Sequence, residues 1–298
     1  MTTQRPPTMD PQAAARWQRM VPQPSAWLHE EVGRRMEDRL QWIVAQPRRW
    51  ANWHPLHGGT QAHGLVSGRY PRAACFVIED ALHVPLAKQR LQPAWWRTAR
   101  WMGPKLHFGP DAPPVDLLWA NMALHMDADP QGLLSHWHRL VEVDGFLMFS
   151  CLGPDTLRQL RAVYATQGWP APCHAFTDMH DWGDMLVRAG FAEPVMDMER
   201  ITLSFSSGHN LLAELRGLGR NLHLERFPAL RGRAWRERLC ATLEEGLAAP
   251  SESGRLALTF EVIYGHAFKP KPKNALKVGP QTAFSLEEMR ETLARGRK

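Results

Sequence analysis

The stretch RRWANWHPLHGGTQAHGL, residues 48–65, places Gly58 after a possible strand and before a possible short helix. In α/β proteins a glycine-rich turn at this point cradles nucleotide-like cofactors, because glycine lets the backbone approach the ligand without a Cβ atom. Here His54 and Leu56 crowd the turn, and Pro55 lacks the N–H that could donate a hydrogen bond. The stretch is therefore a cofactor turn by position that carries unusual side chains.

A second polar feature follows the next predicted strand. The run AACFVIED, residues 73–80, is apolar and of strand length, and it ends on Glu79 and Asp80. An acid at the end of the second strand can accept hydrogen bonds from ribose hydroxyls. The alternative is a strand that simply ends in polar residues, and the spacing by itself favours that alternative.

Asn121 and His125 follow a third strand end, in NMALHM. Ligands of open α/β sheets bind beyond the carboxyl ends of the strands, so both residues are candidates for a site. His174, His180 and Asp181 suggest a metal cluster, but their spacing fits helix packing and capping better. We therefore predict no metal site.

The elements that would position these residues alternate along the chain. Amphipathic or glycine-terminated patterns predict helices at 27–46, 60–70, 84–91, 93–101, 129–141, 154–168, 178–190, 209–223 and 232–247. Apolar runs predict strands at 48–53, 73–80, 105–109, within 115–126, and at 144–153, 194–206 and 256–268. This alternation indicates an α/β fold with a mostly parallel sheet, helices on both faces and an antiparallel late strand.

The domain organisation follows from the same patterns. Residues 1–24 are rich in proline and are predicted to be loosely ordered. Residues 25–275 form one predicted domain with a helical insert at about 208–247. A tail at 276–298 contains a short helix that opens on a capping box.

Composition restricts the class of protein. The chain has 298 residues, a net charge of +6, and four scattered cysteines without disulfide-like or CxxC spacing. It shows neither an apolar membrane-length run nor an apolar signal core, so we expect a cytoplasmic protein without membrane association. The basic residues are interleaved with glutamate, so nucleic-acid binding ranks last among the function classes. The oligomeric state stays open.

Several segments resemble one known family. VDLLWANMALHM, MFSCLGPDTL and DMHDWGD resemble class I S-adenosylmethionine (SAM) methyltransferases, in particular the malonyl-[acyl-carrier-protein] O-methyltransferases of biotin synthesis. The resemblance covers roughly residues 27–270 and is weakest over 50–112. It implies a Rossmann-like sheet, SAM as cofactor, and methyl transfer to a carboxylate carried by an acyl carrier protein.

The resemblance also implies site residues. The family's acidic residue falls at Asn52, and the three glycines of its cofactor loop fall at His54, Leu56 and Gly58, so that the last glycine alone is kept. Glu79 falls at the acid that holds the ribose hydroxyls.

Asn121 and His125 match positions that line the pocket between cofactor and substrate in the family. His125 would orient the carboxylate or line the pocket, and the alternative is a hydrogen-bonded histidine at a helix start.

The insert could supply the substrate contacts. Between residues 213 and 239 it holds seven arginines and three glutamates. Four of the arginines are candidates for binding a carboxylate or an acidic carrier protein: Arg216, Arg220, Arg231 and Arg233. A solvated arginine-rich helix pair is the alternative.

Two hypotheses result from these observations. The first is a SAM-dependent O-methyltransferase acting on a malonyl carboxylate. The second is a methyltransferase-fold paralogue that has lost SAM binding and serves as a binding or regulatory partner. Binding of SAM to the purified protein distinguishes them.

Overall fold

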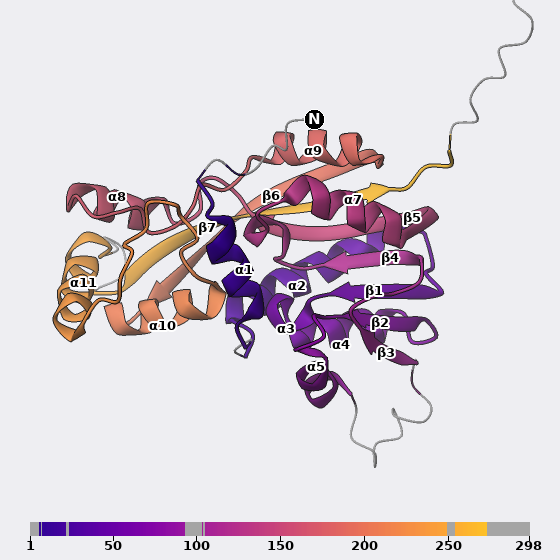
Figure 1. The fold of residues 1–298 in the computed structure, drawn as a ribbon, viewed down its shortest axis with the longest axis horizontal. Helices are drawn as coiled ribbons and strands as arrows, with labels where there is room; N and C mark the ends of the chain where they lie inside the picture. Colours follow the sequence, from indigo (N-terminus) through magenta and orange to yellow (C-terminus); the bar gives the residue numbers. More distant parts are fainter. Residues whose placement is uncertain are drawn as a thin grey trace, which may run out of the picture.

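The computed structural model describes residues 6, 8–21, 24–92, 103, 105–248 and 254–272. Its centre is a seven-stranded sheet in the order β3-β2-β1-β4-β5-β7-β6 (Figure 1). The strands are β1 (Arg49–Trp53), β2 (Ala74–Ile78), β3 (Leu106–Gly109), β4 (Val115–Ala120), β5 (Val141–Leu152), β6 (Ala192–Phe205) and β7 (Leu256–Phe268).

The sheet confirms the predicted α/β fold class. β1 to β5 pair in parallel, and β7 pairs antiparallel with both β5 and β6. The antiparallel strand therefore lies one position inside the edge, and β6 is the edge strand.

Helices cover both faces of the sheet. The α-helices are α1 (Pro11–Arg19), α2 (Trp27–Arg39), α3 (Pro55–Gly58), α4 (Thr60–Arg69), α5 (Val84–Leu91), α7 (Pro130–Leu140), α8 (Arg158–Thr166), α9 (Met179–Ala189), α10 (Gly208–Leu218) and α11 (Arg233–Gly246). Two 3-10 turns are η1 (Leu40–Trp42) and η2 (Leu124–Met126). The helices predicted at 93–101 and in the tail lie outside the described residues.

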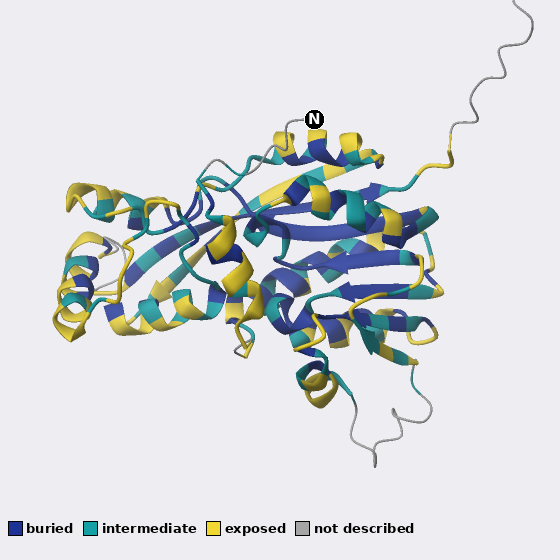
Figure 2. Ribbon diagram, viewed as in Figure 1, coloured by how far each residue is buried: buried dark blue, intermediate teal, exposed yellow. Residues whose placement is uncertain are grey.

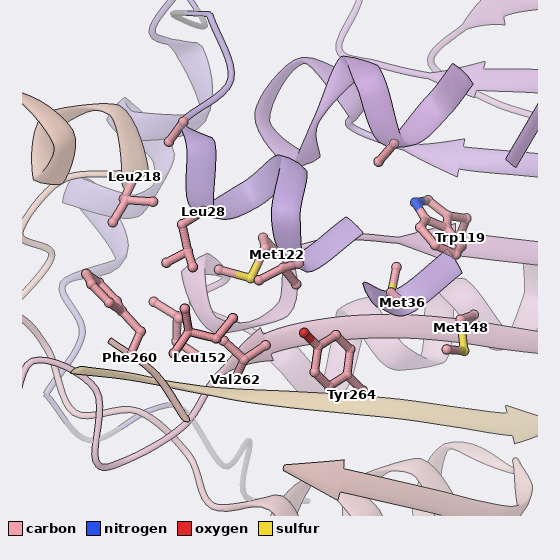
Figure 3. Close-up of a cluster of buried hydrophobic side chains, with 14 of the residues drawn as sticks. Leu28, Met36, Trp119, Met122, Met148, Leu152, Leu218, Phe260, Val262 and Tyr264 are labelled. Atoms are coloured by element: carbon pink, nitrogen blue, oxygen red, sulfur yellow. The ribbon is translucent and has the colours of Figure 1, made fainter. Parts of the chain in front are cut away.

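The core has two layers because successive strand residues face opposite sides. On one face, Trp119 and Met148 belong to a cluster with Leu28 and Met36 of α2 (Figure 3). On the other face, Leu118 packs in the cluster that includes helices α7 and α9. Strands covered on both faces are buried almost throughout, as the blue centre of Figure 2 shows for β4 and β5.

The predicted helical insert forms α10 and α11. Together with α8 they lie at one end of the sheet, against the long strands β6 and β7 (Figure 1). α10 ends at Leu218, so the helix predicted at 209–223 is shorter than expected because Gly219 follows it in an extended conformation.

The segment predicted to be loosely ordered contains α1. Asp10 accepts a hydrogen bond from the Gln12 N–H at 2.8 Å, and Pro11 stands at the first helical position. The Asp10 N–H donates to the carbonyl of Leu222 at 2.8 Å, and the Asp10 carboxylate pairs with Arg226 at 2.7 Å. These contacts join the N-terminal segment to the chain that follows α10.

No helix within the described ranges is long and apolar enough to cross a membrane. All four cysteines are free thiols in buried positions.

Candidate functional site

The cofactor turn lies where β1 ends. His54 has φ 48° and ψ 52°, a left-handed backbone that glycine adopts without strain and that costs other residues on the order of 1 kcal/mol. Pro55 then opens the short helix α3, and the Leu56 side chain is buried in the core. The turn thus keeps the backbone conformation of a glycine at position 54, although His54, Pro55 and Leu56 all carry side chains.

Gly58 is required by a close contact inside the protein. A Cβ atom there would lie 2.6 Å from the carbonyl oxygen of Asn121. The Asn121 amide donates hydrogen bonds to the carbonyls of Gly58 and His29, and its oxygen accepts one from the Ser150 hydroxyl at 2.6 Å. Asn121 is 2% exposed, so its amide joins the turn to α2 and β5 and presents no free donor to a ligand.

Asn52 is directed toward α4. It is buried, and its amide nitrogen lies 3.1 Å from Nδ1 of His63. Burial lowers the pKa of His63 to about 4, so the ring is neutral and its Nδ1 accepts the hydrogen bond. Position 52, which the family resemblance aligns with an acidic residue, thus holds a neutral amide that is hydrogen-bonded to a neutral ring.

The carboxyl group of Glu79 is completely buried next to the turn. Its Oε1 accepts a hydrogen bond from the Leu56 N–H at 2.8 Å, and its Oε2 lies 3.7 Å from Nδ1 of His54. Burial raises the pKa of Glu79 to about 8 and lowers that of His54 to about 4, so the two groups do not form an ion pair at neutral pH. Oε2 has no hydrogen-bond partner among the described residues.

A small hollow lies beyond β1 and β4, where an α/β sheet binds its cofactor. Its volume is about 70 Å³, and its walls include Trp17, His54, His57 and Met126. The rings of Trp17 and His57 lie 4.9 Å apart between centroids, which places helix α1 over the turn. Trp17 is not among the site residues predicted from the sequence, although the Asp10–Pro11 pair is a helix-start signal that could have placed α1.

A larger cavity of about 350 Å³ lies under the insert. Because the family resemblance implies a substrate carried by an acyl carrier protein, we use the label acyl pocket for this cavity. Its walls come from η2, β5, β7, α8, α10 and residues 172–176. Met126 and Leu218 line both the acyl pocket and the hollow at the turn. The two spaces are therefore neighbours.

Arg216 and Arg220 line the acyl pocket. The Arg220 guanidinium donates from Nη1 to the carbonyls of Arg216, at 2.5 Å, and Gly219, at 2.7 Å. Desolvation lowers the pKa of Arg220, and no carboxylate of the described part of the chain lies within 4.0 Å of it. Its Nε and Nη2 make no hydrogen bond to the described residues, and the guanidinium lies 5.6 Å from the ring centroid of Trp17.

His125 also lines the acyl pocket and does not line the hollow. Its ring packs 5.8 Å from that of Phe176, and its carbonyl accepts a hydrogen bond from Nε2 of His174 at 2.9 Å. Burial lowers the pKa of both histidines, so both rings are neutral. The structure separates His125 from Asn121, although the two are only four residues apart.

Arg231 and Arg233 lie elsewhere on the insert. The Arg231 guanidinium lies 3.6 Å from the ring centroid of Trp235 and 4.0 Å from that of Phe227. Arg233 is exposed and pairs with Glu237 at 2.9 Å. The four candidate arginines thus form two separate pairs. No cluster of metal-ligating side chains occurs among the residues that were described.

The sheet order, the antiparallel β7 and a site beyond β1, β2 and β4 together define a class I methyltransferase fold. A solved structure from Bacillus halodurans C-125, assigned to the methyltransferases, superposes with a TM-score of 0.50 at 13% identity, over 78% of this chain and 98% of that one.

Curated proteins identify the family. The malonyl-[acyl-carrier protein] O-methyltransferase of Gallionella capsiferriformans is 36% identical over 260 residues, which is 84% of this chain and 86% of the relative. The protein of the same description from Laribacter hongkongensis is 36% identical over 267 residues, 86% of this chain and 88% of the relative. No family model matches the chain. The chain belongs to the malonyl-[acyl-carrier protein] O-methyltransferase family.

Proposed function

We propose that this chain is a methyltransferase-family protein that binds an acyl group presented by an acyl carrier protein and has lost SAM binding. The contrast between the two spaces carries this proposal. The described residues leave about 70 Å³ at the cofactor turn but about 350 Å³ in the acyl pocket. Pockets for ligands the size of SAM usually measure about 300 to 1,000 Å³.

The residues at the turn do not fit SAM. One oxygen of Glu79, the acid that would hold the ribose, already accepts the Leu56 N–H. The His54 ring lies beside the other oxygen of Glu79. The family has glycine at positions 54 and 56 of the turn, whereas this chain carries the side chains of His54 and Leu56 there. Asn52 also lacks the charge that would stabilise the cationic end of SAM.

The substrate side supports the binding role. The relatives' names specify a substrate carried by an acyl carrier protein. Arg216 and Arg220 offer charge-assisted donors at the acyl pocket, and Arg231 and Arg233 add positive charge outside it. In this proposal the protein acts in the cytoplasm, and its link to biotin synthesis is that of a binding or regulatory partner.

An active O-methyltransferase is the second candidate function. Glu79 stands at the end of β2, where the family's ribose-binding acid is expected, and the hollow adjoins the acyl pocket through Met126 and Leu218. These two observations favour an active enzyme. Titration with SAM distinguishes the active enzyme from the protein that has lost SAM binding.

The test is calorimetric titration of the purified chain with SAM and, separately, S-adenosylhomocysteine up to millimolar concentration. We expect no binding heat and no rise in melting temperature. Ligand at 100 times its Kd would stabilise the fold by about 2.7 kcal/mol, so micromolar binding would be visible and would reject the proposal in favour of the enzyme.

The carrier-binding half is tested with a double substitution. Arg216→Gln with Arg220→Gln removes two charges at the acyl pocket, and we expect at least tenfold weaker binding of a holo acyl carrier protein. Arg48→Gln with Arg72→Gln, at exposed positions just before β1 and β2, removes the same charge from the amino ends of these strands, whereas the pocket lies beyond the carboxyl end of β5. Equal effects of the two pairs would assign the binding to net charge alone.

A further inference from the structure

A groove of about 800 Å³ lies on the face of the sheet that α2 covers, beside the edge strand β6. Alternate residues of β7 and their partners on β5 and β6 form its floor: Met148, Val195, Tyr264, His266 and Phe268. Met148 and Tyr264 belong to the same buried cluster as Met36 of α2 (Figure 3). α2 reaches the groove only with its last residue, Arg39. Past the end of α2, this face of β6 and β7 is therefore open along the groove.

The walls of the groove expose apolar side chains. Trp42 is 80% exposed, Val44 92% and Val195 53%. Large exposed apolar side chains that gather in one groove mark a surface that another segment covers. The charged side chains of the wall, Arg39 and Asp197, pair with each other at 2.6 Å. The groove therefore suits an apolar stripe of side chains better than an ion.

The C-terminal tail leaves the sheet at this groove. β7 ends at Phe268, which lines the groove, and the Lys269 N–H donates to the carbonyl of Gly145 at 2.9 Å. Lys271 then pairs with Asp144 at 3.4 Å. Residues 273–298 follow, beyond the described part of the chain. The tail therefore begins within a few residues of the groove wall.

The sequence of the tail predicts an amphipathic helix. Ser285 and Glu288 have the spacing of a capping box, and Phe284 and Met289 have that of a hydrophobic staple. The apolar residues of this segment recur three and four positions apart, which places them on one helical face: Leu286, Met289 and Leu293. A helix with such a stripe gains stability by packing the stripe against an apolar surface.

The length of the tail fits the groove. A helix over residues 285–295 would be about 16 Å long, and the stretch of β7 from Tyr264 to Phe268 measures about 14 Å. Residues 273–284 can span up to about 40 Å, so they can return the helix to the groove. A tethered segment has an effective concentration in the millimolar range, which favours the chain's own tail over a separate molecule.

We propose that the tail docks in this groove as a helix. The stripe formed by Leu286, Met289 and Leu293 packs against the exposed apolar walls, which are Trp42, Val44 and Val195. The groove shares no wall residue with the hollow at the cofactor turn or with the acyl pocket, so this docking is independent of the proposed function.

Hydrogen exchange of the full chain tests the docking. Trp42→Gln with Val195→Gln removes apolar contacts from the groove, and we expect the amides of residues 286–295 to exchange at least tenfold faster than in the natural chain. Leu82→Gln with Val187→Gln is the matched control, since these side chains are 75% and 56% exposed away from the groove. The control should leave the exchange unchanged.

Two results of the exchange experiment overturn the proposal. The first is equal exchange of the tail amides in the natural chain and in the groove variant. The second is protection of the tail that disappears on dilution, because it would assign the groove to the tail of a second copy. Both groove side chains are mostly exposed, so the variant should keep the melting temperature of the natural chain.

A disulfide locates the helix in the groove. Val195→Cys with Leu293→Cys should form a bond within one chain at least tenfold faster than Val187→Cys with Leu293→Cys, because α9 lies on the other face of β6. The four natural cysteines are buried and should not compete. Equal rates for the two pairs, or a bond that joins two chains, would contradict the proposal.

Discussion

The Glu79 carboxyl group is fully buried and accepts one hydrogen bond, from the Leu56 N–H. Its folded-state pKa is raised from 4.5 to about 8 by burial. The native state therefore favours the protonated carboxyl, and this stabilisation is complete below pH 4.5 and is lost as the pH rises through about 8.

Glu79→Gln should remove this pH dependence, because the amide oxygen can still accept the Leu56 N–H. Relative to the natural chain, the variant should gain stability of about 3 kcal/mol between pH 5 and pH 8. Urea unfolding at both pH values measures the difference. The prediction fails if the difference between the two proteins is the same at pH 5 and pH 8, and Glu245→Gln, at an exposed position, is the control.

The histidines of the turn act in the opposite direction. Burial lowers the pKa of His54 from 6.5 to about 4 and that of His57 to about 3. Their stabilisation is complete above pH 6.5 and is lost as the pH falls through about 4 and 3. The natural chain and the Glu79→Gln variant both keep these histidines. Their contribution therefore largely cancels in the difference between the two free energies of unfolding.

At the scale of elements, the turn between β1 and α4 is held by a contact with the end of β4. Gly58→Ala would bring a Cβ atom within 2.6 Å of the Asn121 carbonyl, and a backbone oxygen cannot move aside easily. We expect a loss of about 2 to 3 kcal/mol in the free energy of unfolding.

Gly64→Ala is the matched substitution. Gly64 lies inside α4, and no atom lies within 4 Å of its added Cβ. Because alanine loses less backbone entropy in a helix, this variant should gain about 0.5 to 1 kcal/mol. Chemical denaturation measures both. A Gly58→Ala protein as stable as Gly64→Ala would show that the turn is not constrained by Asn121.

Helix α1 is a second element whose position depends on a few contacts. Asp10 caps the helix and pairs with Arg226 at 2.7 Å. Asp10→Ala removes both interactions and should destabilise docking of α1 by about 1 to 2 kcal/mol. Asp10→Asn keeps the cap and removes the ion pair, so it should lose less.

Hydrogen exchange of the α1 amides measures this docking. Faster exchange in Asp10→Ala than in Asp10→Asn is the expected order. Equal exchange rates in the two variants, both faster than in the natural chain, would show that the ion pair, and not the cap, holds the helix.

On the scale of the whole molecule, the four cysteines report on global opening. They come from β2, β5, the chain near residue 173 and α11, and all are buried. Burial raises the pKa of Cys173 to about 11 and raises those of Cys75, Cys151 and Cys240 as well, so the reactive thiolates are scarce.

A thiol reagent at pH 8 should therefore label the native chain slowly and all four cysteines once the chain is unfolded in urea. Counting the modified thiols by mass spectrometry follows the reaction. Rapid labelling of one cysteine in the native protein would reveal a local opening near it. The cysteine spacing showed no disulfide-like pattern, which agrees with four free thiols, but it could not indicate their burial.

Much of the positive charge of the chain lies in the insert. The net charge is +6, and residues 213–239 alone contribute seven arginines and three glutamates. The sequence placed these arginines in one insert, whereas the structure puts Arg216 and Arg220 at the acyl pocket and Arg231 and Arg233 outside it.

The sequence by itself determined the family, the alternation of strands and helices, and the altered residues of the cofactor turn. These features are local, since periodicity and motif spacing are written in neighbouring residues. The tertiary structure alone decided what the altered turn contacts. Glu79 accepts the N–H of Leu56, 23 residues away, and Asn121 donates to the carbonyl of His29, 92 residues away. Trp17, from a segment that composition predicted to be loosely ordered, lies against His57. Such contacts depend on how helices pack on the sheet, and no short-range pattern encodes that packing.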